Sequence, residues 1–400
     1  MMKDKTKITD ISRLKLAIFA FCLSPFCLLA QNTVAPEDAI RAALQNHPAI
    51  KAAAFDVQAK KYAEKTALNL PNPEVNAESP TGQFYAVGVL QSFEFPTVYA
   101  RQKQVAKAET ALAQAGQRIS ENDLRYAVRT MYLDLQVADY QSRQWRTRDS
   151  LYQAISVAAG RQFDAGEIDF LQKTLVENEA GKVTQERRAA EQLALTATGQ
   201  LKTLTGLADW DALLPLRPDT TGLAGISGPG ANPAILYEQQ AVQVAEKQVA
   251  LAKSKALPNF SIGYMNQGER ETPMDYRFRA SIGLPLWVGQ YRAGVNVAKA
   301  ESLAAVARAA AQSQAIAIQL QQTDTEALTA LGFVRYYEQE ALPRSRALIS
   351  AVLRMRDAGQ TDYVTFLKTL DEAFAIQREY AVQIQAFEMA RIQRLYLAGQ

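Results

Sequence analysis

The pentapeptide VAKAE occurs at Val105–Glu109 and again at Val297–Glu301, in a chain of 400 residues. The two copies are therefore separated by 192 residues, counted from 105 to 297. Other stretches pair at nearly the same spacing: QNHPAI at 45–50 with GANPAI at 230–235, and FDAGEIDF at 163–170 with RDAGQTDY at 356–363. Ordered landmarks at a nearly constant spacing indicate a tandem repeat of one long unit.

The repeat predicts the division of the chain. We expect a signal peptide at 1–30, a first structural repeat at 31–205, a linker at 206–231 and a second structural repeat at 232–400. Basic residues dominate the first fifteen positions, and the apolar run LAIFAFCLSPFCLLA follows at 16–30. This order is typical of a cleaved secretory signal peptide. A membrane anchor is the weaker alternative, because the run is too short to span a membrane and contains Pro25.

Removal of residues 1–30 changes the charge and the cysteine content. Five of the 44 basic residues and two of the 41 acidic ones lie there, which leaves 39 of each. The mature chain then has no formal charge that would favour nucleic acid as a partner. Cys22 and Cys27 leave as well, and neither follows the small residue that lipidation needs, so no lipid anchor is expected.

The residue types also argue against an enzyme. His47 is the one histidine, and the mature chain has no cysteine, no G-x-S-x-G motif and no phosphate-binding loop. A metal site built from histidine and cysteine is excluded by their number, and we expect no cofactor.

Each half is expected to open with a helix, from 36 to about 69 and from 233 to just before Pro258. A strand hairpin should follow, with strands near 74–79 and 84–95 in the first half and near 259–266 and 277–287 in the second. Apolar residues alternate along Phe84–Phe95 and Arg277–Trp287, with Leu90 out of place in the first pattern. Such strands suit either the wall of a membrane barrel or a soluble sheet with one buried face, and alternation does not distinguish them.

Long helices should follow the hairpins. The segment 97–160 contains no proline and would extend about 96 Å as a helix. A second helix should return from each DAG turn, to Thr205 and to Ala398. Heptad spacing predicts a packing seam in each half, made of Val105, Ala108, Leu112, Ala115 and Ile119 in the first and of Val297, Ala300, Ala304, Ala307 and Ala311 in the second.

Four strands are too few for a membrane barrel, whose smallest bacterial form has about eight, and an open edge in lipid is very costly. If the hairpins lie in a membrane, several chains must share one barrel.

The doubled unit, the NHPAI and NPAI helix starts, LPNF, GLPLWVGQYRAGVNVAKAE and RDAGQTDY resemble the TolC family of outer-membrane efflux proteins. Within that family the closest resemblance is to the CusC/CzcC-like branch of heavy-metal exporters. One departure is His47, where the family usually has asparagine; we expect Asn46 to cap that helix instead.

The resemblance implies a mainly α fold with a small transmembrane β part. It implies a homotrimer whose chains each give four strands to one twelve-stranded barrel, joined to a long α-helical coiled-coil barrel across the periplasm. It further implies the outer membrane of a Gram-negative bacterium as location. The trimer would be a passive exit duct for an inner-membrane RND-type pump, reached through a periplasmic adaptor (a membrane fusion protein), with heavy-metal cations as a candidate cargo.

The resemblance also assigns candidate sites. The two helix–helix turns would form a periplasmic tip that serves as gate and adaptor-docking site; the alternative is that these are ordinary capping and solvent-facing residues. Independently of the resemblance, four aromatic residues lie at strand ends, where an aromatic belt of a membrane interface would be found. They could equally pack where strand becomes helix. The tip residues are Arg161, Phe163, Asp164, Gly166, Asp169, Arg354, Arg356, Asp357, Gly359 and Asp362, and the aromatic residues are Phe93, Phe95, Trp287 and Tyr291.

A soluble periplasmic coiled-coil adaptor or scaffold is the rival hypothesis. Adaptors also carry long helical hairpins, but they lack a doubled plan with a strand hairpin in each half. A requirement for detergent in solution would distinguish the two.

Overall fold

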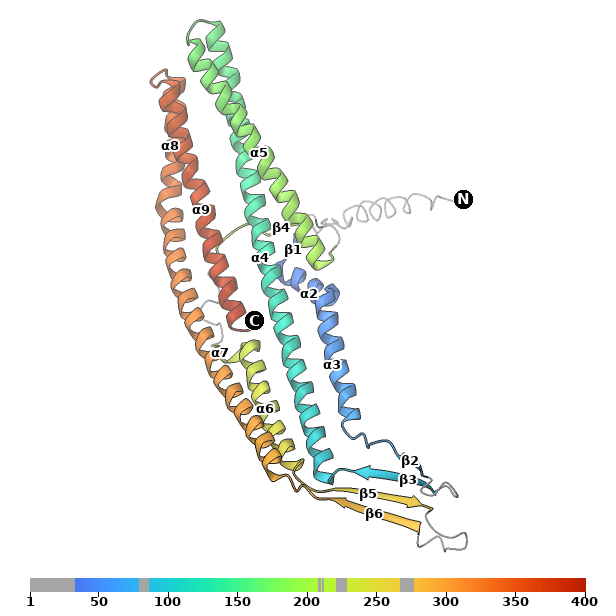
Figure 1. The fold of residues 1–400 in the computed structure, drawn as a ribbon. Helices are drawn as coiled ribbons and strands as arrows, with labels where there is room; N and C mark the ends of the chain where they lie inside the picture. The colour runs from blue at the N-terminus through green and yellow to red at the C-terminus, as the bar shows by residue number, and fades with distance from the viewer. Residues whose placement is uncertain (1–32, 79–85, 208–209, 211, 221–228, 267–276) are drawn as a thin grey trace, which may run out of the picture.

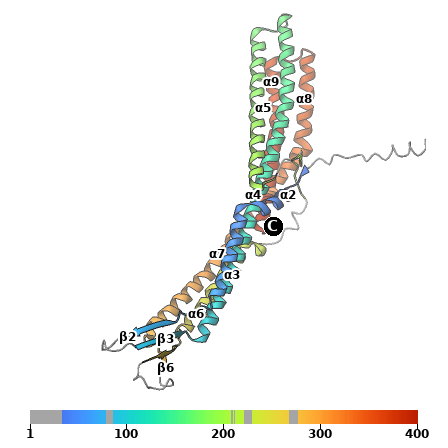
Figure 2. The same cartoon turned by 90° about the vertical axis from the view of Figure 1, so that its right-hand side faces the viewer.

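The computed structural model describes residues 33–78, 86–207, 210, 212–220, 229–266 and 277–400. The expected signal peptide, the two hairpin loops at 80–83 and 267–275 and part of the expected linker lie outside these residues, as do Phe84 and Tyr85. The described chain is elongated, with a small sheet at one end and two helix–helix turns at the other (Figure 1). The C-terminus lies near the middle, where the molecule bends (Figure 2).

The same order of elements occurs twice, with a strand pair between helices each time. The first series is α2 (Pro36–Asn46), α3 (Pro48–Thr66), β2 (Glu74–Glu78), β3 (Ala86–Phe93), α4 (Pro96–Asp164) and α5 (Phe170–Thr205). The second is α6 (Pro233–Ser254), β5 (Asn259–Met265), β6 (Phe278–Gly283), α7 (Val288–Tyr336), a π-helical turn (Tyr337–Ala341), α8 (Leu342–Asp357) and α9 (Tyr363–Leu397). The two VAKAE stretches lie at the same distance from the starts of α4 and α7.

The helices form one layer. Near the sheet the order across the layer is α3, α4, α6 and α7, and near the helix–helix turns it is α5, α4, α9 and α8 (Figure 1). Among the described elements, α3 and α5 have a neighbour on one side only, and so do α7 and α8. The layer therefore has two open edges, each running the length of the molecule.

The sheet continues this arrangement. Its strand order is β2-β3-β5-β6 and every pairing is antiparallel, so the two predicted hairpins are confirmed and β3–β5 joins the two halves. The strands at its edges, β2 and β6, lead to the helices at the edges of the layer, α3 and α7. A second, two-stranded parallel sheet pairs β1 (Thr33–Val34) with β4 (Ala212–Leu213).

The core lies between the helices in separate apolar clusters. One cluster ties the α4–α5 and α8–α9 hairpins together below the turns, around Tyr152, Val176, Phe366 and Leu370. Another holds α2 and β1 against α4 near the middle, where the Tyr132 hydroxyl donates to the Val34 carbonyl at 2.8 Å. The chain thus has no single globular centre, and burial follows the contact lines of the layer.

The prediction of one helix from 36 to about 69 was wrong. The helix ends at Asn46 and a new one begins at Pro48, because proline has no amide hydrogen and disfavours the α conformation of the residue before it. His47 is accordingly extended, and its Nδ1 accepts from the Ala49 amide at 3.2 Å. The cap is therefore His47 and not Asn46, whose side chain instead donates to the Thr205 carbonyl at 3.2 Å.

The heptad seam expected in the second half is not buried within the chain. Val105 and Ala115 of the first seam are buried, whereas Val297, the matching start of the second, is 57% exposed. The buried stripe of α7 runs instead through Ala298, Ala305 and Ile316, and Ile316 packs with Ile235 of α6 and Leu397 of α9. The reason is position: α4 has helices on both sides, and α7 lies at an edge.

A break in the long helix of the second half was not predicted. The π-helical turn at Tyr337–Ala341 separates α7 from α8 just before Pro343, and the Leu342 amide bonds to the Tyr337 carbonyl, five residues back. Proline removes a helical hydrogen bond and crowds the preceding turn, and one wider turn relieves both effects. The equivalent stretch of α4 has no proline and stays continuous.

Gly263 of β5 is a position where the fold tolerates no side chain. A Cβ there would lie 2.5 Å from the Val89 carbonyl oxygen of β3. Gly263→Ala should therefore push the two strands apart and destabilise the protein by about 1–3 kcal/mol, measured as a lower melting temperature. Gly283→Ala is the matched control, because the atoms nearest to its Cβ belong to the movable side chain of Asn259. Equal melting temperatures for the two variants would contradict the prediction.

Candidate functional site

One face of the four-stranded sheet is almost entirely apolar. Residues directly opposite each other in an antiparallel pair share a face, so the register assigns every side chain to one side. Val75 faces Val89, which faces Tyr264, which faces Phe278. The remaining residues of this apolar face are Ala77, Val87, Gln91, Phe93, Phe260, Ile262, Ala280 and Ile282.

The opposite face is polar or small. It carries Glu74, Asn76, Ser92, Asn259, Ser261, Arg279 and Ser281, together with Gly88, Gly263 and Gly283. The backbone pair of Glu78 with Ala86 continues the same register. Met265 also belongs to this face, where it is buried. Leu90, which broke the sequence pattern, lies on this face beside Gly263, where the missing side chain leaves room for it. The sheet is thus two-sided, with a hydrocarbon side and a water-compatible side.

The apolar face is exposed in the single chain. Val75 is 71% exposed, Phe278 65% and Ile282 56%. A contiguous exposed apolar face marks contact with a membrane or with another protein. Of the two alternatives that the sequence left open, the soluble sheet with a buried face is not what the described residues form.

Both predicted tip turns lie at the end of the molecule opposite the sheet (Figure 1). Gly166 and Gly359 have φ of 75° and 66°, the left-handed conformation that favours glycine. Asp169 caps α5 in a capping box with Gln172, and Asp362 accepts from the amides of residues 364 and 365 at the start of α9. The role that these two aspartates have in the structure is helix capping.

The other predicted tip residues are arranged around the two turns. Arg356 donates through Nε to Asp357 at 3.0 Å and lies over the Phe366 ring at 5.3 Å from its centroid. The Phe163 ring lies 6.4 Å from that of Phe170. Arg161, Asp164 and Arg354 are exposed at this end.

Hydrogen bonds to the Asp362 carboxyl group favour its ionised form. The Thr365 amide and hydroxyl and the Val364 amide lower the pKa of the Asp362 carboxyl below its usual value. The carboxylate is fully exposed, so it stays ionised at neutral pH and keeps the cap.

Sequence analysis missed an apolar feature at the same end. Phe170, Leu171 and Val364, which follow the caps, are 69%, 76% and 60% exposed. Leu171 and Val364 are equivalent positions, each two residues after its capping aspartate. Their repetition in the two halves was the available signal, and it was overlooked because the first residues of a helix are normally read as capping positions.

Two contacts join the hairpins of the two halves near the turns. The Tyr363 hydroxyl donates to Gln162 Oε1 at 2.5 Å. Deeper in the layer Arg148 of α4 is only 2% exposed and donates to the Phe374 carbonyl of α9 at 2.6 Å. Its guanidinium also lies between the rings of Trp145 and Phe374, at 4.7 and 4.3 Å from their centroids. Sequence gave no reason to single out this arginine.

The four predicted interface aromatics lie where sheet becomes helix. Phe93 is on the apolar face of β3, and the Phe95 ring is 6.0 Å from that of Phe260. Trp287, just before α7, is 78% exposed, and Tyr291 lies in the first turn of α7. Phe95 thus packs within the chain, whereas Trp287 is exposed.

Within the described part of the chain, no helix is long and apolar enough to cross a membrane. Nor do its histidine, cysteine, aspartate and glutamate residues gather in a group of three that could hold a metal ion.

No family model matches the sequence, and no curated protein matches it either. The fold, in contrast, is similar to those of solved channel proteins. A structure of CusC has a TM-score of 0.75 at 15% identity and covers 91% of each chain. The outer-membrane channel OprN has a TM-score of 0.77 at 15% identity, over 91% of this chain and 89% of that one. The CmeC outer-membrane channel of Campylobacter jejuni has a TM-score of 0.72 at 14% identity, over 91% and 85%. This chain therefore has the fold of the outer-membrane channels, as its resemblance to the TolC family predicted.

Proposed function

We propose that this protein is the outer-membrane channel of a tripartite efflux system, a passive exit duct that receives substrate from an inner-membrane RND-type pump through a periplasmic adaptor. The observation that carries the proposal is the sheet. One exposed apolar face, one polar face and two unpaired edges are the properties of a segment of barrel wall. In a soluble adaptor or scaffold, an exposed apolar face and two unpaired sheet edges would be unfavourable.

The open edges support closure by further copies of the same chain. Within the chain α4 lies between α3 and α6, and β3 lies between β2 and β5. If the two halves are equivalent, α7 corresponds to α4 and β6 corresponds to β3. The open side of α7 would then bind α3 of a second copy, and the open edge of β6 would pair with β2 of that copy. The exposed seam of α7 that begins at Val297 is then an interface between chains. The division into repeats at 31–205 and 232–400 is part of this proposal.

The equivalence of the halves also gives the register between chains. Pro73 and Pro258 precede equivalent strands, so Glu74 corresponds to Asn259 and Ala77 to Ile262. The hairpin partners of Glu74 and Asn259 are Leu90 and Gly283, so the next residues, Gln91 and Leu284, also correspond. Because Gln91 faces Ile262 across β3 and β5, Leu284 should face Ala77 of the next chain. Both positions lie on the apolar side, and the 60% exposure of Leu284 in the single chain is then explained.

Three copies make the best channel. Two would give eight strands, and a barrel of about eight strands is filled by its own side chains. Three would give twelve strands with the polar face inside and the apolar face against outer-membrane lipid. The helix layers would close into a periplasmic tunnel about 100 Å long, from the 69 residues of α4 at 1.5 Å each. The signal peptide expected at 1–30 would export the chain, without lipidation.

The far end of the helices would meet the adaptor. Exposed Leu171 and Val364, next to the two turns, supply apolar contacts that the charged residues at this end surround. Such an apolar centre with a polar rim is the usual composition of a protein interface. Similarity to CusC is no greater than to OprN, so a metal cargo rests on the sequence resemblance alone.

The test is the native state of the protein. The chain, expressed with its leader, should fractionate with the outer membrane, require detergent, and have the mass of three chains. Reconstituted in planar bilayers, it should conduct ions. A monomer that stays in solution without detergent would refute the proposal.

The tip prediction concerns the gate. If charge-assisted contacts of Arg354 and Asp357 hold the three tips together, Arg354→Ala and Asp357→Ala should increase the ion conductance of reconstituted trimers. Arg344→Ala, which removes an exposed pair with Glu340 away from the tip, is the matched control. Unchanged conductance in both tip variants would rule out a gating role for these two residues.

A further inference from the structure

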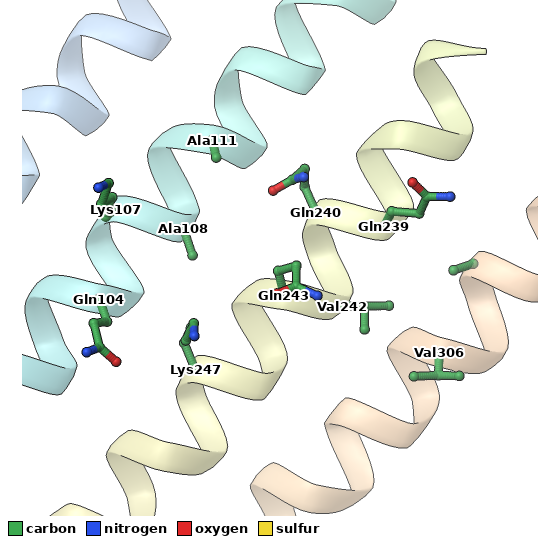
Figure 3. Close-up of a pocket in the computed structure, with 11 residues that line it drawn as sticks. Gln104, Lys107, Ala108, Ala111, Gln239, Gln240, Val242, Gln243, Lys247 and Val306 are labelled. Carbon is green, nitrogen blue, oxygen red and sulfur yellow. The ribbon is translucent and has the colours of Figure 1, made fainter. Parts of the chain in front are cut away.

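A groove of about 790 Å³ lies over α6, with α4 and α7 on either side (Figure 3). Its volume is within the range of sites for drug-sized molecules, about 300–1,000 Å³. Lys107 comes from α4, and Lys247, Gln240 and Gln243 come from α6. Figure 3 shows the α6 side chains between the two neighbouring helices, with Val306 on α7 at the far side.

The charged residues that line the groove are all positive. Lys107 and Lys247 are its charged residues, and no acidic side chain lines it. No ion pair among the described residues includes either lysine. Lys60 of α3, in contrast, pairs with Glu109 at 2.9 Å. Two lysines from different helices thus border a groove that no acidic side chain lines.

The rest of the lining is of two kinds. Glutamines, among them Gln240 and Gln243, supply neutral donors and acceptors. Small apolar side chains from all three helices, including Ala108 and Val306, supply hydrocarbon surface. A ligand that satisfies both parts has an acid group and an apolar body.

The groove can stay open in the proposed trimer. Chains would join through α3 and α7 at the edges, and α6 lies inside the layer. The groove lies over α6, between α4 and α7. With this face turned inward in the ring of three chains, the groove would line the tunnel.

We propose that this groove is a binding site for amphipathic organic anions that pass through the duct. The acid group lies between Lys107 and Lys247, and the apolar body lies on the alanine and valine surface. This inference rests on the proposed function for its place in the tunnel, and it names the class of cargo.

The test uses the full-length protein in lipid nanodiscs and naphthalene-2-sulfonate as the probe, with binding measured by equilibrium dialysis. Lys107→Gln with Lys247→Gln should weaken binding about tenfold, as expected for the loss of two partly exposed charge contacts. Lys103→Gln with Lys253→Gln is the matched control, because it removes two exposed lysines from the same helices outside the groove. Sulfate, an anion with no apolar body, should compete poorly.

Reversing the charge of the two lysines tests the site by a gain of binding as well as by a loss. Lys107→Glu with Lys247→Glu should abolish binding of the sulfonate and create binding of naphthylmethylammonium. Equal sulfonate binding in all variants, or none in the unchanged protein, would overturn the site. The ion conductance of the same proteins in planar bilayers is measured as an independent test of the channel function. Lysine-dependent binding without conductance would refute the channel function and support the anion site. Conductance without lysine-dependent binding would support the channel function and refute the anion site.

Discussion

Protein carrying Ala77→Cys and Leu284→Cys should form covalently linked trimers on oxidation. In the proposed barrel Leu284 of one chain faces Ala77 of the next, on the apolar side. Residues opposite each other in an antiparallel pair have Cα atoms about 4.5–5.5 Å apart, which suits a disulfide. No other cysteine should compete for disulfide formation, since Cys22 and Cys27 both lie in the expected leader.

A bond within one chain would not imitate this result. β2 and β6 are the two edges of a four-stranded sheet, so their Cα atoms are about 14 Å apart at 4.8 Å per strand spacing. Disulfides need Cα atoms closer than about 7 Å. Any link between positions 77 and 284 must therefore join two chains.

The measurement is non-reducing gel electrophoresis of detergent-extracted protein. We expect linked dimers and trimers that revert to monomers on reduction. Asn76→Cys with Leu284→Cys is the matched control, because residue 76 belongs to the opposite face. Only monomers in the test variant, or equal linking in both, would contradict the register.

Arg148→Glu should destabilise the tip half of the molecule by about 3–5 kcal/mol, the usual cost of an uncompensated buried charge. Burial lowers the pKa of Arg148 to about 10, and nearby Arg378 acts in the same direction. The guanidinium is therefore still charged at neutral pH. Its position is held by the Phe374 carbonyl and by the rings of Trp145 and Phe374.

A glutamate at this position would meet repulsion in place of these contacts. The cavity of about 260 Å³ beside Arg148 is also lined by Glu179, Glu186 and Asp371. A new carboxylate would face a carbonyl oxygen, the negative faces of two rings and these acids. Lys182 and Arg378 also line the cavity, but they are already opposed by its acids.

Arg148→Met is the matched control. Methionine fills a similar volume, and no carboxylate within ion-pair distance of Arg148 would lose its partner among the described residues. We expect a change below about 1.5 kcal/mol. Hydrogen exchange of α4 and α9 should therefore rise strongly in the glutamate variant and little in the methionine variant. Equal exchange in the two would mean that the charge at this position does not matter.

The sequence by itself predicted the helices, the two hairpins and the TolC-like plan. These features have local signals that do not depend on neighbours. Alternation along 277–287 indicates a two-faced strand, the absence of proline from 97 to 160 permits one long helix, and glycine after DA marks each helix turn. Where the local rule was not applied, as at Pro48, the prediction was wrong for a reason that the sequence already contained.

Only the tertiary structure decided what depends on neighbours. It showed that equivalent seams differ, buried at Val105 and exposed at Val297, because one helix is internal to the layer and the other is at its edge. It placed Lys107 and Lys247, from two helices, along one groove, and it buried Arg148 against α9, 226 residues away. Heptad spacing states which face of a helix packs, but not whether a partner is present. That depends on where the layer ends, and the edges follow from the order of the helices in space.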